Sequence, residues 1–354
     1  MKESITMSKP FNIGIIGMGM IGDVHLERIR QDGRGEVTWI ATRSDETLQT
    51  KLEKYQVPHG TTDYREMLAD ASLDAVIIAS PPFTHLEILE STLKAGKHVL
   101  FEKPMVIRPT DLDPLLKMID QYPKQLILEC SCRHARLQPK FRFIKKMIQD
   151  GVLGDIYHIH HNHLMRSTFI EYNPAGVWAH QKVLAGGGPF MDQGVYDLSF
   201  HLGILDDTPN LVSVQSFSRN GLKNYHIPNF KSDIEEHGAA YMTFDTGLTY
   251  YYERGNGVHF EADNETRIYG TQGGLRFSMS TWDSPKITHF SMDTSGQEIQ
   301  ETLIPEGLQD HDDNLALMIH FLDCLEGKAE PQMTVSLAAK HQRILFRILG
   351  EGET

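Results

Sequence analysis

The chain has 354 residues, 40% of them hydrophobic and 23% charged, a composition typical of a globular protein large enough for two domains. Its 34 basic and 47 acidic residues give a formal charge of -13, which argues against nucleic acids and anionic membranes as partners. No apolar run is long enough to span a membrane, the first residues lack the apolar core of a signal peptide, and three cysteines are too few for a disulfide framework. We therefore expect a cytoplasmic protein.

The first 130 residues alternate strand and helix patterns, after a stretch at 1–9 that we expect to be a frayed tail. Short apolar runs predict strands at 12–16, 37–41, 74–79, 98–101 and 125–128. Between two of them, Thr84 and Glu87 resemble a capping box, and Gly96 can end the helix. Continuous apolar strands of this kind indicate a parallel sheet covered on both faces.

After about residue 153 the pattern changes to long alternating stretches, which predict a mainly antiparallel sheet. These stretches lie at 155–165, 211–219, 238–254 and 265–278, and helices are expected from Pro139, at 315–325 and near 335–348. We predict an α/β fold with a Rossmann-type doubly wound parallel sheet in residues 1–130. An α+β domain with a large open, mainly antiparallel sheet should follow in residues 131–354.

Gly17-x-Gly19-x-x-Gly22 follows the first strand directly and opens a helix. Gly17 allows the tight turn, Gly19 lets the backbone approach a pyrophosphate, and Gly22 permits close packing. Backbone N–H groups at the start of the helix then face the phosphates. In this strand–turn–helix context the pattern predicts dinucleotide binding.

The end of the second strand indicates which dinucleotide binds. Enzymes that use NAD usually carry Asp or Glu there, whereas this chain has Thr42, Arg43 and Ser44. A guanidinium and two hydroxyls can bind a 2′-phosphate, so the pattern favours NADP(H). The alternative is NAD(H), with Arg43 solvated and Asp45 on the ribose.

Glu102-Lys103-Pro104 follows an apolar strand about eighty residues after the glycine motif. A lysine held there would lie beside whatever the glycine loop binds. An ammonium at that position can stabilise an alkoxide and relay a proton. Glu102 or Asp192 could offset the cost of burying it.

These motifs resemble the glucose–fructose oxidoreductase, inositol dehydrogenase and rhizopine-catabolism (Gfo/Idh/MocA) family over nearly the whole chain. The resemblance rests on the glycine motif, Ser80-Pro81-Pro82 with His85, the stretch 96–104, and the stretch 186–197. It implies the following cofactor-binding residues: Gly17, Gly19, Met20, Ile21, Gly22, Thr42, Arg43, Ser44, Ser80, Pro81, Pro82, His85, Glu102 and Lys103.

The resemblance also implies that Lys103 lies near the nicotinamide, with Asp192 in a second motif. Where many members carry a histidine four residues later, this chain has Tyr196, as in some members of the family. Four residues make about one helical turn, so both side chains can face one cleft. We predict Tyr196 as the proton donor, Lys103 as its electrostatic partner and Asp192 as the residue that orients them.

Other candidate residues follow from the next strand and the loop after it. The family places the substrate cleft there, which makes Arg166, Trp178 and His180 candidate substrate contacts. The nearby histidines are split between the two faces of a strand, with His158 and His160 on one and His161 and His163 on the other. No local set of three ligands results, and no metal is expected.

The leading hypothesis is therefore an NAD(P)-dependent oxidoreductase acting on a sugar, cyclitol or related polyol. One alternative is a glycosidase that works by transient oxidation with a bound NAD. The other is a non-catalytic regulator that senses a dinucleotide, which would not need Lys103, Asp192 and Tyr196 together. The resemblance also implies a homodimer or homotetramer.

Overall fold

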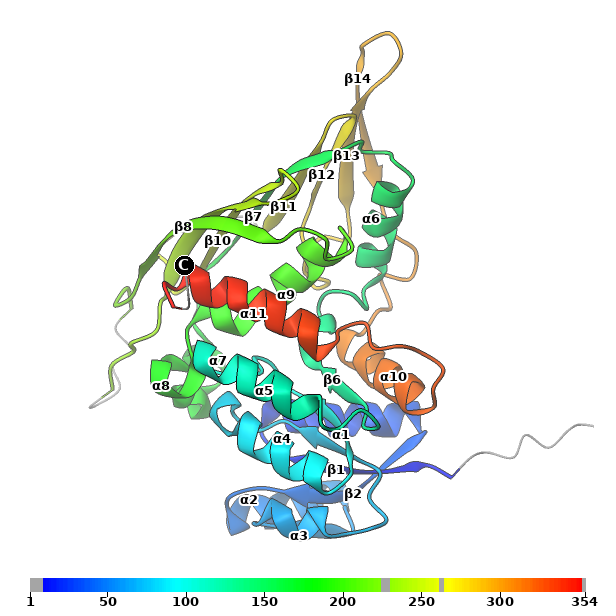
Figure 1. The fold of residues 1–354 in the computed structure, drawn as a ribbon, viewed down its shortest axis with the longest axis vertical. Coiled ribbons are helices and arrows are strands. Elements are labelled where there is room, and N and C mark those ends of the chain that lie inside the picture. Colours follow the sequence, from blue (N-terminus) through cyan, green and yellow to red (C-terminus); the bar gives the residue numbers. More distant parts are fainter. Residues whose placement is uncertain (1–8, 224–229, 261–263, 352–354) are drawn as a thin grey trace, which may run out of the picture. The chain divides into compact units, whose positions relative to one another are not determined.

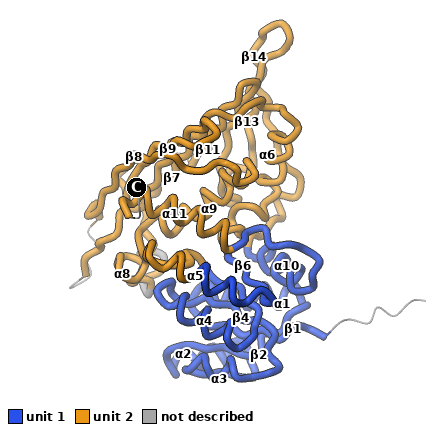
Figure 2. The backbone as a smooth tube through the Cα atoms, in the orientation of Figure 1, with its two compact units in different colours: residues 1–102, 115–130, 314–334 blue, residues 103–114, 131–313, 335–354 orange. Residues whose placement is uncertain are grey.

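The computed structural model describes residues 9–223, 230–260 and 264–351, and the chain forms two compact units (Figures 1 and 2). Unit 1 comprises Met1–Glu102, Leu115–Cys130 and Asn314–Thr334, and unit 2 comprises Lys103–Pro114, Ser131–Asp313 and Val335–Thr354. The tail predicted at 1–9 lies almost entirely outside the described residues. Within the described part of the chain, no helix has both the length and the apolar character needed to cross a bilayer.

Unit 1 contains a six-stranded parallel sheet with the strand order β3-β2-β1-β4-β5-β6, which is the Rossmann order. Its strands are β1 (Phe11–Ile16), β2 (Gly35–Ala41), β3 (His59–Thr61), β4 (Ala75–Ile78), β5 (His98–Phe101) and β6 (Ile127–Glu129). All four residues of β4 are buried, as the continuous apolar run predicts for a sheet covered on both faces. The predicted doubly wound sheet is confirmed, with β3 as an additional short strand.

The helices of unit 1 alternate with these strands along the chain. They are α1 (Met20–Asp32), α2 (Asp45–Tyr55), α3 (Tyr64–Leu68), η1 (Pro82–Thr84) and α4 (His85–Lys94), with most of α5 (Leu112–Ile119) and α10 (Asp313–Leu325). Gly96 follows α4 with a φ of +74°, as expected for a helix end. The predicted capping box is wrong, because the Thr84 hydroxyl donates to the Pro81 carbonyl and makes no capping hydrogen bond.

Unit 2 is built on an eight-stranded sheet with the order β14-β13-β12-β11-β7-β10-β9-β8. Its strands are β7 (Ile156–Met165), β8 (Leu211–Arg219), β9 (His237–Phe244), β10 (Thr249–Asn256), β11 (Glu265–Gly270), β12 (Gly273–Phe277), β13 (Ile287–Met292) and β14 (Glu298–Leu303). All neighbours are antiparallel except β7 and β10, so the prediction of a mainly antiparallel sheet is confirmed.

The helices of unit 2 include one that is almost completely buried, α9. They are η2 (Pro109–Asp111), α6 (Pro139–Gln149), α7 (Phe169–Tyr172), η4 (Pro174–His180), α8 (Lys182–Ala185), α9 (Pro189–Gly203) and α11 (Val335–Ile348), with most of η3 (Cys130–Cys132). Helix α9 packs against β10 and α11, which lie together in Figure 1. Cys130 and Cys132 both lie in the 3₁₀ turn η3, and both are buried.

The two compact units do not divide at residue 130 alone, because two segments lie in the unit on the other side of that boundary. Residues 314–334 belong to unit 1, where Arg34 bonds the carboxylates of Asp323 and Glu326, each at 2.6 Å. Residues 103–114 belong to unit 2, where the side chain of Gln342 donates to the Val106 carbonyl. Contacts between residues far apart in sequence, which no local composition shows, produce both differences.

Candidate functional site

The glycine loop between β1 and α1 has the backbone geometry that the motif predicts. Gly17 has a φ of +96°, and a Cβ there would lie 2.6 Å from the backbone nitrogen of Ser80. A Cβ on Gly22 would lie 2.1 Å from the carbonyl oxygen of Gly17, so glycine lets α1 pack against the loop. The protein's own packing therefore requires glycine at both positions.

Gly19 differs from the other two, because no atom of the described residues beyond its chain neighbours lies within 4 Å of the position that its Cβ would take. It is the N-cap of α1 and supplies no side-chain cap, while Met20 beside it is 57% exposed and Ile21 is half-buried. The first N–H groups of a helix lack partners within the helix, and this end favours negative charge. An open cradle lined by uncapped amides fits the pyrophosphate of a dinucleotide.

The residues expected at the ribose follow β2 directly. The Ser44 hydroxyl accepts the N–H of Thr47 at 3.3 Å and caps α2, and the Thr42 hydroxyl accepts the N–H of Ser44 at 3.4 Å. These two hydroxyls thus shape the turn, whereas Arg43 is exposed. Of these three side chains, that of Arg43 carries the positive charge that can bind a phosphate.

The residues predicted after β4 form one turn that contacts the glycine loop. The Ser80 hydroxyl donates to Thr84 at 2.7 Å, and the ring of His85 donates from Nε2 to the Ser80 carbonyl at 2.9 Å. Pro81 and Pro82 lie between them. Strands β1 and β4 are the neighbours at which the chain reverses its direction across the sheet, the usual place for a ligand in such folds.

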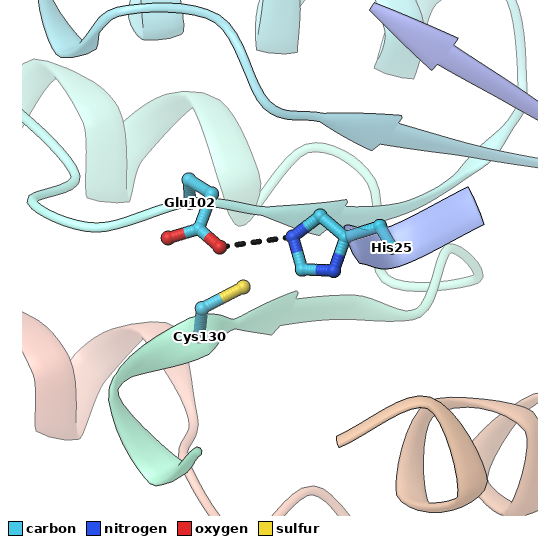
Figure 3. A group of neighbouring side chains, drawn as sticks. All are labelled: His25, Glu102 and Cys130. Carbon is cyan, nitrogen blue, oxygen red and sulfur yellow. Dashed lines mark hydrogen bonds and ion pairs between the residues drawn. The ribbon is translucent and has the colours of Figure 1, made fainter. Parts of the chain in front are cut away.

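Glu102 pairs with His25 inside unit 1, where both side chains are buried (Figure 3). His25 Nε2 and Glu102 Oε1 are 2.9 Å apart, and Cys130 lies beside them. The ligand atoms of these three residues lie within 4.8 Å of one another. Of the two carboxylates considered as partners of Lys103, Glu102 is thus engaged with His25.

Lys103 pairs with Asp192 on the first turn of α9, within unit 2. Its Nζ lies 2.5 Å from the Asp192 carboxylate and 2.6 Å from the Asp192 carbonyl oxygen. Burial acts to raise the pKa of Asp192, but the charge and hydrogen bond of Lys103 outweigh it and lower that pKa. Asp192 is therefore ionised at neutral pH and keeps an ammonium group beside it.

Tyr196 lies one helical turn after Asp192, and its ring contacts Lys103. The ammonium of Lys103 is 5.2 Å from the centre of this ring. The guanidinium of Arg133 donates to the Tyr196 hydroxyl at 2.5 Å, and both side chains are buried. Arg133 was not anticipated from the sequence, because it lies in a turn outside every recognisable motif.

The hydrogen bond from Arg133 fixes the direction of the Tyr196 proton. Arginine has no acceptor, so the phenol oxygen accepts this bond and its own proton points to another group. The ring of His134 packs edge-on against Tyr196 at 4.8 Å, and its Nδ1 bonds Asp313 at 2.7 Å. Burial lowers the pKa of His134, although Asp313 opposes it. The phenol is thus oriented by one cation and contacted by a second.

The three predicted substrate contacts occupy different settings in unit 2. His180 is buried and close enough to Asp192 for that carboxylate to act on it, although burial dominates and lowers the pKa of His180. Arg166 is exposed directly after β7, and its carbonyl accepts a bond from Lys223. Trp178 packs against Phe169 with ring centres 6.5 Å apart.

The histidines of β7 are divided between the two sides of the sheet, as predicted. His161 and His163 are buried, whereas His158 and His160 are half-buried on the opposite face. His161 bonds the Thr266 hydroxyl at 2.8 Å, and His158 bonds the Thr249 hydroxyl at 2.8 Å. Hydrogen bonds within the sheet account for both.

Comparisons with known proteins agree with this architecture. A family model described as "Oxidoreductase family, NAD-binding Rossmann fold" matches residues 11–130, and the "GFO/IDH/MocA C-terminal domain" matches residues 141–276. The chain is 28% identical over 263 residues to myo-inositol 2-dehydrogenase of Thermotoga maritima, covering 74% of each protein. It is 24% identical over 269 residues to the uncharacterized oxidoreductase YrbE of Bacillus subtilis, covering 75% of this chain and 73% of that protein.

Solved structures show the same fold. Levoglucosan dehydrogenase in complex with NADH and levoglucosan has a TM-score of 0.82 at 17% identity, covering 97% of each chain. Aldose-aldose oxidoreductase from Caulobacter crescentus has a TM-score of 0.78 at 20% identity, covering 98% of this chain and 99% of that one. At these identities the likeness is one of fold.

Proposed function

Because this chain belongs to the Gfo/Idh/MocA family of oxidoreductases, we propose that it acts on a sugar, cyclitol or related polyol with a nicotinamide cofactor. The reaction is hydride transfer at a carbinol or carbonyl carbon. The relatives named for myo-inositol and levoglucosan support this substrate class. The observation that carries the proposal is the convergence of Lys103, Asp192, Arg133 and Tyr196 in unit 2.

The bound nicotinamide supplies the acceptor or donor of the hydride. During oxidation, the substrate hydroxyl loses its proton as the carbon–hydrogen bond breaks, and we assign this proton to Tyr196. Lys103 stabilises the negative charge that develops on the substrate oxygen, and Asp192 holds the ammonium in place. In the reverse direction, Tyr196 returns the proton to the oxygen.

Arg133 gives Tyr196 the ability to exchange a proton. Its guanidinium stays charged and donates to the phenol oxygen, so it stabilises a phenolate more than a neutral phenol. General acid–base groups of this kind typically contribute about 10²- to 10⁴-fold in rate. A tyrosine between two cations can thus do the work that a histidine does in other proteins.

We propose NADP(H) as the preferred cofactor. Arg43 supports this, since it is exposed immediately after β2 and can bond a 2′-phosphate. If Asp45 at the start of α2 holds the ribose instead, NAD(H) is preferred. The kcat/KM ratio of NADPH to NADH decides between them: it should exceed one in the wild type and fall in Arg43→Ala.

We also propose a cytoplasmic homodimer or homotetramer that associates through the open face of the unit 2 sheet. This face carries a row of rings on neighbouring strands, including His158, His160, Tyr241, Tyr251 and Tyr269. Tyr241 is 46% exposed and Tyr269 is 36% exposed, and such aromatic patches often contact a second subunit. Light scattering on the purified protein measures the mass directly, and a monomer at all concentrations contradicts this assembly.

The experiment for the activity is a panel of sugars, inositols and dihydrodiols with NADP⁺ and NAD⁺, followed by nicotinamide absorbance. Tyr196→Phe should lower kcat by about 10²- to 10⁴-fold and leave cofactor binding intact. Tyr122→Phe, at a half-buried tyrosine of unit 1 between α5 and β6, is the matched control and should change neither. Full kcat in Tyr196→Phe would remove this tyrosine from the chemistry, and net release of sugar from a glycoside without absorbance change would replace the proposed reaction.

A further inference from the structure

The first turn of α9 is held by a carboxylate from a distant part of the chain. Glu235 is buried two residues before β9, and its two oxygens accept the N–H of Gly188 at 2.7 Å and of Phe190 at 3.1 Å. The helix has Gly188 as its N-cap, which lacks a side chain, followed by Pro189, which lacks an N–H. Glu235 thus supplies the cap that the helix's own sequence lacks.

Two glycines make this approach possible. A Cβ on Gly188 would lie 1.9 Å from the carbonyl oxygen of Glu235, a distance that no side chain can accept. A Cβ on Gly187 would lie 2.6 Å from the side chain of Met191 and 3.3 Å from the Glu235 carboxylate. The glycines before Pro189 therefore give the Glu235 segment direct access to the amides of α9.

Whatever fixes this turn also fixes the partner of Lys103. The N–H of Asp192 donates to the Gly188 carbonyl at 2.9 Å, so Asp192 closes the first turn of α9. Lys103 bonds both the carboxylate and the carbonyl oxygen of Asp192, and a shift of this turn moves both acceptors together. We propose that Glu235 is a positioning residue for the reaction, because its carboxylate holds the turn that places Asp192 against Lys103. The role rests on the function proposed above.

The charge state of Glu235 is sensitive to pH near neutrality. Burial raises the pKa of Glu235 to about 7, while the amide hydrogen bonds oppose this rise. Lys182 on α8 is a charged group that acts on Glu235 and opposes the rise of its pKa, and the Nζ of Lys182 pairs with Glu351 at 2.5 Å. Protonation turns one acceptor oxygen into a donor, so one of the two amide bonds is lost and the anchor weakens.

The test uses two variants and a matched control in the full chain. Glu235→Gln keeps one acceptor oxygen and cannot titrate, Glu235→Ala keeps none, and Glu298→Gln changes an exposed glutamate of β14. We expect kcat to fall by about tenfold to a hundredfold in Glu235→Ala and by less in Glu235→Gln, since a displacement of about 1 Å can cost a hundredfold. The KM for NADPH and the control variant should be unchanged.

Two further readouts separate positioning from simple stability. Amide hydrogen exchange at residues 188 and 190–192 should be faster in both Glu235 variants at a temperature where each is fully folded. In the wild type, kcat should fall as pH drops below about 7, and Glu235→Gln should lack this step. This comparison needs no alanine variant, which keeps the test valid if Glu235→Ala does not fold.

The outcomes are distinct. Equal kcat and an equal pH profile in the wild type and Glu235→Gln overturn the role of Glu235 and leave the proposed reaction intact. A fall in kcat that matches only the unfolded fraction also overturns it, because the residue then acts on stability alone. A wild type that turns over no member of the panel removes the proposed function, and this role with it.

Discussion

Replacement of Asp197 by asparagine should remove a large part of the stability of unit 2. Asp197 follows Tyr196 on α9 and is fully buried, as is its partner Arg254 on β10 at 1% exposure. The carboxylate accepts from the Nε and, at 2.8 Å, from an Nη of Arg254, and also from the Tyr252 hydroxyl at 2.6 Å. An asparagine side chain would keep the shape and one acceptor oxygen but leave the guanidinium buried without a counter-charge.

The magnitude follows from that uncompensated charge. Breaking a buried ion pair by removing one partner costs about 3–5 kcal/mol, and the oxygen retained by asparagine places our expectation near the lower end, about 3 kcal/mol. A typical domain has only about 5–15 kcal/mol of stability, so this loss is readily measured. Urea unfolding of Asp197→Asn, monitored by amide exchange within unit 2, is the assay. Asp310→Asn, at an exposed carboxylate, is the control.

The pH dependence of stability provides an independent test of the same ion pair. Burial acts to raise the pKa of Asp197, but Arg254 outweighs it and holds that pKa well below its usual range. The stabilisation is therefore present above the unfolded pKa and is lost as pH falls through the folded one. Asp197→Asn should weaken this acid dependence. A loss below about 0.5 kcal/mol at neutral pH, within the range of ordinary surface substitutions, would refute the reasoning.

Three other outcomes are expected. Gly19→Ala should keep the wild-type Tm but lose dinucleotide binding in a fluorescence titration, because a Cβ at Gly19 enters open space where the dinucleotide would lie. Gly22→Ala should lower the Tm, because a Cβ there meets packed protein atoms. Burial raises the pKa of Glu235 from 4.5 to about 7, so its contribution to stability is complete below about pH 4.5 and is lost as pH rises through about 7. At about 1.4 kcal/mol per pKa unit, the stability lost between these two pH values is about 3 kcal/mol. Urea titrations should find this loss in the wild type and not in Glu235→Gln. Arg133→Met should shift the pH–rate profile to higher pH and, combined with Tyr196→Phe, should cost little more than Tyr196→Phe alone, because both act on one proton.

The sequence predicts unit 1 better than the outer part of the unit 2 sheet, for a physical reason. Strands such as β4 are buried on both faces and appear as continuous apolar runs. β14 reads Glu-Ile-Gln-Glu-Thr-Leu and is mostly exposed, so its pattern resembles a loop, and β13 and β14 were not predicted. The stretch 265–278 was predicted as a single unit but divides at Thr271 and Gln272 into β11 and β12.

The candidate site shows the same limit at the level of single residues. Lys103, Asp192 and Tyr196 lie in motifs, and a spacing of four residues indicates that the last two share a helix face. Arg133 reaches Tyr196 from a segment without periodicity, and Glu235 reaches α9 from a loop 47 residues after Gly188. A chain shows spacing within an element, whereas partners from separate elements become visible only once the fold brings them together.

Two carboxylates, those of Glu235 and Asp197, hold α9 and so keep the candidate catalytic residues on this helix in position. The helix begins in consecutive glycines, whose backbone freedom would let its first turn shift. Glu235 fixes that turn from one side, and Asp197 joins the third turn to Arg254 of the sheet. Both anchors bury charge at a cost to stability. Tyr196 lies in sequence between the amides that Glu235 holds and Asp197, and it is nearly as buried as Asp197. Buried carboxylates thus hold α9 both before and after the stretch that carries Asp192 and Tyr196. Such an arrangement is expected where the position of side chains matters more than stability, which indicates that this helix is built to place these two residues.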